Sequence, residues 1–160
     1  MEHKEENWQS LHNTLLQDLQ NEVRLTRELL SNMHQEEVSL MLHDMGSLNQ
    51  VLIQRSNMLE KLSFLRSERH LTTQKIERIA SVQNPHPSLD HILPPHEETS
   101  AEILSLSDQL FALTERLNRQ HSHNQRLGEH PEHHRYAPIP AAQEQRAKRK
   151  ASVATYNLKR

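Results

Sequence analysis

Histidine is the residue type in this chain whose number and spacing could do chemistry. There are 13 histidines among 160 residues, and imidazole nitrogens are common zinc ligands. Several cluster towards the C-terminus: His121-x-His123, His130 and His133-His134. The cluster straddles an expected helix end and a proline-containing segment, and the chain has no cysteine to complete a zinc site. We interpret these histidines as solvated surface residues, with an adventitious metal site as the alternative, and assign no metal and no cofactor.

Other catalytic patterns are missing from the sequence. It contains no glycine-rich phosphate loop, no nucleophile elbow and no HExxH motif. The basic run Lys148-Arg149-Lys150 could contact nucleic acid or an anionic membrane, but the net charge of the whole chain is -2 and only Tyr156 offers an aromatic platform nearby. We therefore predict that the chain is not an enzyme, disfavour a nucleic-acid partner and assign no catalytic residue.

Glycine and proline divide the chain into the elements that must position any site. The first 84 residues contain one glycine, Gly46, and no proline, whereas all seven prolines lie between Pro85 and Pro140. This distribution predicts helices at about 5–43, 47–81 and 99–127, with a Pro-rich joint at 82–98. The hydrophobic share of 34% can fill a narrow seam between long helices but no broad interior. We expect an all-α, elongated, antiparallel three-helix coiled-coil bundle over residues 1–128, followed by a disordered basic tail over 129–160.

The seam of the second expected helix contains arginine as well as aliphatic residues. Its positions follow a heptad spacing: Val51, Arg55, Met58, Leu62, Leu65, Arg69, Thr72, Ile76 and Ile79. One interpretation of the two arginines is that their stems pack while the guanidinium groups reach water or a neighbouring glutamate. The alternative is that they fix the register of the helices.

Three helix ends carry capping signals. Asp44 is the expected N-cap of the second helix, with Ser47 as the competing cap. Thr99 and Glu102 form a capping-box pattern at the start of the third helix. Gly128 stands where a C′ glycine would end that helix. The stripe of the third helix becomes polar after Leu117, which predicts that its last turns either fray or await a partner.

The stretch from Glu28 to Arg69 resembles the FlgN family of flagellar and type III secretion export chaperones. Members typically show paired leucines, an acidic residue that opens a second helix, a leucine, a basic residue and a leucine-rich run that closes on arginine. The matching residues here are Leu29, Leu30, Asp44, Leu48, Arg55, Leu59, Leu62, Leu65 and Arg69. The third helix is similar as well through Leu117-Asn118 and Asn124-Gln125-Arg126-Leu127, as is a tail that starts near Tyr136.

The resemblance implies a cytoplasmic bacterial chaperone that binds and protects a helical segment of hook-associated or other export substrates and docks on the export apparatus. The absence of an apolar run long enough to span a bilayer agrees with that location. A flexibly joined third helix could give up its packing to a client helix. We expect the client-binding residues to be Leu106, Leu110, Leu113, Leu117, Val153, Tyr156 and Leu158. On this view, replacing Leu113 and Leu117 with alanine weakens the capture of a client.

A structural coiled-coil protein, such as a stalk or scaffold component of a secretion apparatus, is the competing hypothesis. Its helices would pair between chains and form a stable oligomer without a client. A chaperone should instead be a monomer or a weak homodimer that binds one client. The sequence leaves the oligomeric state and the identity of the client open.

Overall fold

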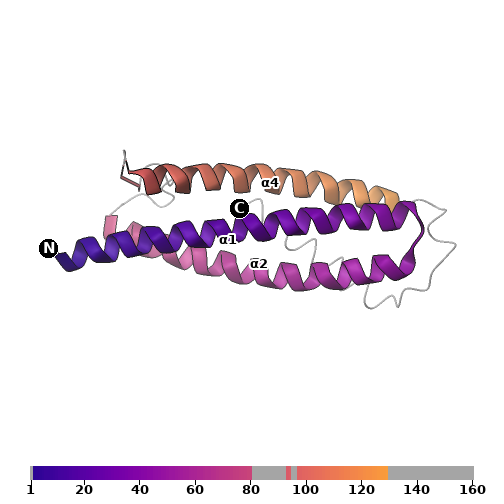
Figure 1. The fold of residues 1–160 in the computed structure, drawn as a ribbon, viewed down its shortest axis with the longest axis horizontal. Helices are drawn as coiled ribbons and strands as arrows, with labels where there is room; N and C mark the ends of the chain where they lie inside the picture. The colour runs from indigo at the N-terminus through magenta and orange to yellow at the C-terminus, as the bar shows by residue number, and fades with distance from the viewer. Residues whose placement is uncertain (1, 81–92, 95–96, 130–160) are drawn as a thin grey trace. The chain divides into compact units, whose positions relative to one another are not determined.

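The computed structural model describes the backbone of residues 2–80, 93–94 and 97–129, and within it the side chains from residue 7 onward. These ranges contain three helices and no strand: α1 (Glu2–Met41), α2 (Met45–Ala80) and α4 (Glu98–Gly128) (Figure 1). The predicted all-α class is confirmed, and the helix ends lie within three residues of the expected ones. The joint lies mostly, and the tail almost entirely, outside the described residues.

Contacts along the chain define two units, and each helix contributes a segment to both. Unit 1 comprises residues 1–24 and 64–111, and unit 2 comprises residues 25–63 and 112–160. Hence α1 and α4 run from unit 1 into unit 2, whereas α2 runs from unit 2 into unit 1. Within each unit the α1 and α2 segments are antiparallel. In unit 1, for example, Asp18 pairs with Thr72 and Glu22 with Arg66. Each unit is therefore a three-helix arrangement of the predicted kind.

Aliphatic side chains at heptad spacing form the core of each unit. In unit 1 the buried members include Leu15, Leu19, Val23, Ile76, Ile103 and Leu110. In unit 2 they include Leu25, Leu29, Leu30, Met33, Leu48, Val51, Leu59, Leu62, Leu113 and Leu117. Burial of each such side chain contributes about 1.5–3 kcal/mol to the free energy of unfolding. The narrow leucine seam predicted from the composition is therefore the source of the packing.

The turn between α1 and α2 depends on His43 and Asp44 rather than on Gly46. His43 has a φ of 54°, and the amides of His43 and Asp44 donate to the carbonyls of Leu40 and Ser39. This is the Schellman pattern, in which a left-handed residue ends a helix. Asp44 then caps α2, because its carboxylate accepts from the Ser47 amide at 3.0 Å and the Ser47 hydroxyl at 2.7 Å. The predicted Asp44 cap is confirmed, and the same two bonds lower the pKa of Asp44.

Both predicted caps of α4 are wrong. The helix begins at Glu98, and the Ala101 amide donates to the Glu97 carbonyl at 3.2 Å, so Thr99 lies inside the first turn. Glu102 instead accepts a hydrogen bond from Gln20 of α1 at 3.1 Å. At the other end Gly128 is the last helical residue and has no positive φ. The Glu129 amide simply continues the helical pattern to the Gln125 carbonyl.

Candidate functional site

The predicted client-binding leucines belong to the cores of their units. Leu110 in unit 1 is 9% exposed and Leu106 is partly buried, while in unit 2 Leu113 and Leu117 are 8% and 1% exposed. Their side chains are therefore covered by the helix segments on which α4 packs. The other predicted site residues, Val153, Tyr156 and Leu158, lie outside the described residues.

A buried polar network connects the three helix segments of unit 2. Arg55 of α2 donates from Nη2 to Glu36 Oε2 at 2.8 Å and from Nε to Asn32 Oδ1 at 3.1 Å. Asn32 in turn donates to the Val51 carbonyl at 3.0 Å. Asn124 of α4 donates from Nδ2 to the same Glu36 oxygen and to the Met33 carbonyl at 2.7 Å. The carboxylate of Glu36 on α1 thus accepts hydrogen bonds from both α2 and α4.

Burial makes this network energetically important. Asn32, Arg55 and Asn124 are 2%, 3% and 3% exposed. A buried carboxylate or amide without a partner costs about 1–3 kcal/mol or more, so each member depends on the others. Of the two interpretations of Arg55, contact with a glutamate is confirmed, although the guanidinium is buried rather than extended into water. Its bonds to two α1 residues also agree with a role in register.

Glu37 adds a second, more exposed link between α1 and α4. Gln120 donates from Nε2 to Glu37 Oε2 at 2.7 Å and to Asn124 Oδ1 at 2.9 Å, which joins this link to the buried network. His123 Nε2 lies 3.0 Å from Glu37 Oε1, and His34 lies 3.5 Å from Oε2. The hydrogen bond from Gln120, followed by those of the two histidines, lowers the pKa of Glu37. The carboxylate is thereby held ionised as an acceptor.

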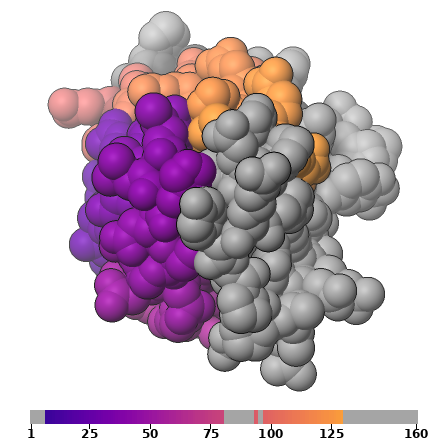
Figure 2. Space-filling model, turned by 90° about the vertical axis from the view of Figure 1, so that its right-hand side faces the viewer, coloured from indigo at the N-terminus to yellow at the C-terminus, as the bar shows by residue number. Residues whose placement is uncertain are grey.

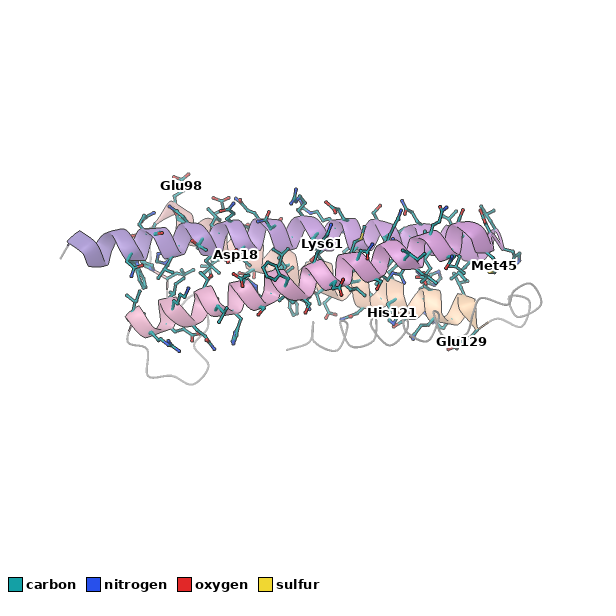
Figure 3. The ribbon with its side chains drawn as sticks, turned by 90° about the horizontal axis from the view of Figure 1, so that it is seen from below. Asp18, Met45, Lys61, Glu98, His121 and Glu129 are labelled. Atoms are coloured by element: carbon teal, nitrogen blue, oxygen red, sulfur yellow. The ribbon has the colours of Figure 1, made fainter. Side chains whose placement is uncertain are left out.

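His121 lies on α4 in the turn that carries these contacts (Figure 3). It is partly buried, and this desolvation lowers the pKa of its imidazole, with the positive charge of Arg55 as the next cause. The charge of Glu36 acts in the opposite direction. Because the neutral form is favoured there, His121 differs from the solvated surface residue that the sequence predicted. His123, with a 46% exposed side chain, fits that prediction better.

The polar residues at the end of α4 therefore have partners. The sequence predicted that the last turns fray or await a partner, because the stripe changes from Leu117 to Gln120 and Asn124. In the structure these turns are helical to Gly128, and Gln120 and Asn124 bond to α1. Figures 1 and 3 place the end of α4, at Glu129, beside the turn that leads into Met45. The space-filling view shows orange atoms from this part of α4 against purple atoms near that turn (Figure 2).

Unit 1 has a polar cluster that joins α1 to α2. Glu22 is 1% exposed and accepts from Arg66 Nε at 3.0 Å and Arg69 Nε at 2.6 Å. The two arginine side chains are 17% and 31% exposed, so both remain partly hydrated. Asp18 accepts from the Thr72 hydroxyl at 3.2 Å, and burial raises the pKa of this carboxyl despite that bond.

The described helices contain neither a cluster of metal-ligating side chains nor a membrane-spanning helix. No group of three or more histidine or acidic side chains in residues 7–80 and 97–129 is arranged to hold a metal ion. His130, His133 and His134 of the predicted cluster lie beyond these ranges. Among the helices described, none combines the length and the hydropathy that a membrane span requires.

Comparisons with family models, with curated proteins and with solved structures find no match to this chain. The fold and the polar network therefore carry the functional argument together with the sequence resemblance.

Proposed function

We propose that this chain is a cytoplasmic bacterial export chaperone of the FlgN kind, and not an enzyme. It would bind and protect a helical segment of a hook-associated protein or another type III secretion substrate before export, and then dock on the export apparatus. The observation that carries the proposal is the way α4 is held in unit 2. Its last turns bond to α1 through polar side chains, principally Gln120 and Asn124, rather than through continuous leucine packing.

Polar anchoring suits a helix that must leave its place. An intramolecular hydrogen bond contributes only about 0.5–1.5 kcal/mol net, because water replaces it when the helix departs. A client helix with similar donors can recover the same bonds in the same groove, whereas a fully apolar seam would make departure costly. The third helix is thus a placeholder for the client in this proposal.

The residues that carry the resemblance also have definite places in the bundle. Leu29, Leu30, Leu59 and Leu62 are buried, and Asp44 caps α2. Arg55 joins α2 to Glu36, and Arg69 binds Glu22. The pattern therefore corresponds to the contacts that hold α1 and α2 together as the platform for a third helix. This correspondence supports the proposed family at the level of architecture.

The test is co-purification of the tagged full-length chain with hook-associated and other export substrates encoded by the same genome. We expect one substrate to co-purify near a 1:1 ratio through a terminal helical segment. Because Leu113 and Leu117 are buried in unit 2, their replacement by alanine should loosen α4 and increase capture, the reverse of the expectation from sequence alone. A matched exposed change, Ala112→Ser, should leave capture unchanged. If no export substrate co-purifies with the wild-type chain or the double variant, the proposal is wrong.

The scaffold hypothesis has one specific observation in its favour. Phe64 and Leu71 lie one heptad apart on α2 and are 64% and 47% exposed, so an apolar pair faces away from the core of unit 1. Such a pair could pack against another chain. Light scattering of the purified protein decides this, because a scaffold should form a stable oligomer that the double change Phe64→Ser and Leu71→Ser disrupts. A monomer that is unaffected by the change would exclude the scaffold role of this face.

A further inference from the structure

The side of α1 that meets α4 in unit 2 presents hydrogen-bond acceptors. Glu36 Oε2 and the Met33 carbonyl both accept from Asn124, and Glu37 accepts from Gln120 and His123. Arg55 balances the charge of Glu36, whereas two histidines, His34 and His123, lie within ion-pair distance of Glu37. Any helix in this position must therefore bring donors and must not bring another acid.

The matching face of α4 supplies those donors at fixed spacing. Gln120, His123 and Asn124 occupy positions i, i+3 and i+4, which share one side of a helix. Leu113 and Leu117 precede them at i−7 and i−3 and are buried. The pattern from apolar to donor positions thus reads Leu-x3-Leu-x2-Gln-x2-His-Asn along residues 113–124.

We propose that the partner of this groove is a helix that repeats this pattern: two aliphatic residues followed by amide or basic donors at the positions of Gln120, His123 and Asn124, with no acidic residue among them. The inference deepens the proposed function and rests on it, since it names the chemistry of the client segment that replaces the end of α4. The position of Asn124 is the most selective. Asn124 uses one nitrogen, Nδ2, to donate to both Glu36 and the Met33 carbonyl, so the residue at this position needs a nitrogen with at least two N–H bonds.

The groove should select among helices because an unsuitable residue leaves buried acceptors without a donor. A leucine at the Asn124 position would leave Glu36 and the Met33 carbonyl without this donor in a buried site, which should weaken binding by about tenfold or more. An aspartate there would place a second negative charge against Glu36 and should bind more weakly still. An arginine or glutamine in place of His123 should be accepted, because Glu37 needs only a donor.

Asn118 provides a matched control on the same helix. It is partly buried, but neither its Nδ2 nor its Oδ1 has a hydrogen-bond partner in the described part of the chain. Replacing Asn118 with leucine therefore removes an amide of equal size from α4 and breaks no bond. A role that depends on side-chain volume alone would make the two asparagines equivalent, whereas the donor pattern distinguishes them.

The experiment uses a fluorescent peptide of residues 113–129 and the full-length chain, with anisotropy as the readout. The chain's own α4 competes at high effective concentration, so the Asn124→Leu chain, whose α4 fits less well, should bind the wild-type peptide about tenfold more tightly than the wild-type chain does. On either chain the peptide with Asn124→Leu should bind about tenfold more weakly than the wild-type peptide. The peptide with Asn118→Leu should bind at least as well as the wild-type peptide.

The outcomes separate the inference from the proposed function. Equal binding of the Asn124→Leu and wild-type peptides would overturn the donor pattern while leaving helix replacement intact. Absence of peptide binding to both chains at millimolar concentration would overturn helix replacement in this groove, and with it the inference. Co-purification of an export substrate would still test the chaperone role separately. If circular dichroism shows that the Asn124→Leu chain is unfolded, the Gln120→Ala chain replaces it, since that change removes a more exposed donor.

Discussion

Each unit contains a glutamate of α1 that accepts from two neighbouring side chains, but the partners differ: Glu22 in unit 1 is 1% exposed and Glu36 in unit 2 is 13% exposed. In unit 1, Glu22 binds two arginines, both from α2 and both partly exposed. In unit 2, Glu36 binds one buried arginine from α2 and one buried asparagine from α4. The two arginine bonds of the first arrangement join α1 to α2. In the second arrangement, the packing of α4 depends on the same carboxylate that binds α2. Unit 2 therefore contains a buried polar contact that selects the residue of the third helix.

The role of α4 differs between the units in the same sense. In unit 1 its buried aliphatic residues include Ile103 and Leu110, and the hydrogen bond that Gln20 of α1 donates to Glu102 is exposed. In unit 2 the leucine contacts give way to Gln120 and Asn124 within two turns. Apolar packing tolerates many partners of suitable volume, whereas buried donors accept few. In the proposed function, the leucines therefore supply affinity for the helix at the α4 position, and the polar turns supply selectivity among such helices.

Loss of Arg55 should have the largest effect. Arg55→Met keeps an apolar stem but leaves Glu36, whose side chain is 13% exposed, without its cation, which should destabilise the protein by about 3–5 kcal/mol. Arg69→Met is the matched change in unit 1. It should cost less than about 1 kcal/mol, because Arg69 is 31% exposed and Arg66 remains on Glu22. Urea denaturation followed by circular dichroism measures both, and equal losses would remove the distinction between the units.

Neutralising Glu22 should have a smaller effect than the loss of Arg55. Glu22→Gln keeps the shape and one acceptor oxygen, while both arginines can turn towards water, so we expect a loss of about 1–2 kcal/mol. The loss should appear equally whether or not a client or peptide occupies unit 2. Denaturation in the presence and absence of the 113–129 peptide tests this point. A loss that vanishes when the peptide is added would mean that Glu22 also governs the third helix.

Sequence patterns predicted those features that depend on one helix at a time. The lack of glycine and proline predicted the long helices, heptad spacing predicted the buried leucines, and the chemistry of aspartate predicted the Asp44 cap. The turn at His43 was not predicted, because a left-handed histidine is uncommon and the boundary between the first two helices was inferred from Gly46. The Thr99 and Gly128 caps failed because the backbone continued the helix at both positions without side-chain help.

The polar network could not be derived from sequence because it depends on the register of three helices. A polar residue in a seam, such as Asn124, has the same appearance whether it frays, waits for a partner or bonds to a buried acid. Two members of the network, Arg55 and Asn124, lie on the expected stripes of the second and third helices, whereas Asn32 and Glu36 were not expected on the inner stripe of the first helix. Only the alignment of α1 with both neighbours shows that they meet.

Acidification should weaken unit 2 through His121. Its pKa is lowered in the folded state by burial and then by Arg55, so below the unfolded pKa of about 6.5 the unfolded chain binds a proton that the folded chain resists. Stability is therefore complete above that pH and falls as the pH drops towards the folded pKa. Partial exposure limits the loss to less than about 1 kcal/mol. The difference in stability between wild type and His121→Gln, measured from pH 7.5 to 5, isolates this residue from the other histidines.

The result would be contradicted if that difference stayed constant with pH. His123→Gln is the matched control, because it removes a histidine two residues away on the same helix whose side chain is 46% exposed.

The smallest expected effect concerns the turn of unit 2. His43 has a left-handed backbone, which costs an L-residue about 1 kcal/mol, so His43→Gly should stabilise the protein by about 0.5–1 kcal/mol. Gly46→Ala serves as its counterpart: Gly46 is helical, an added Cβ would lie 3.4 Å from Asp44 Oδ1, and the gain should be similar through helix propensity. Neither change touches the polar network. If unit 2 binds the third helix through that network, both variants should raise the urea midpoint and leave peptide affinity unchanged; a parallel loss of affinity would assign recognition to the turn instead.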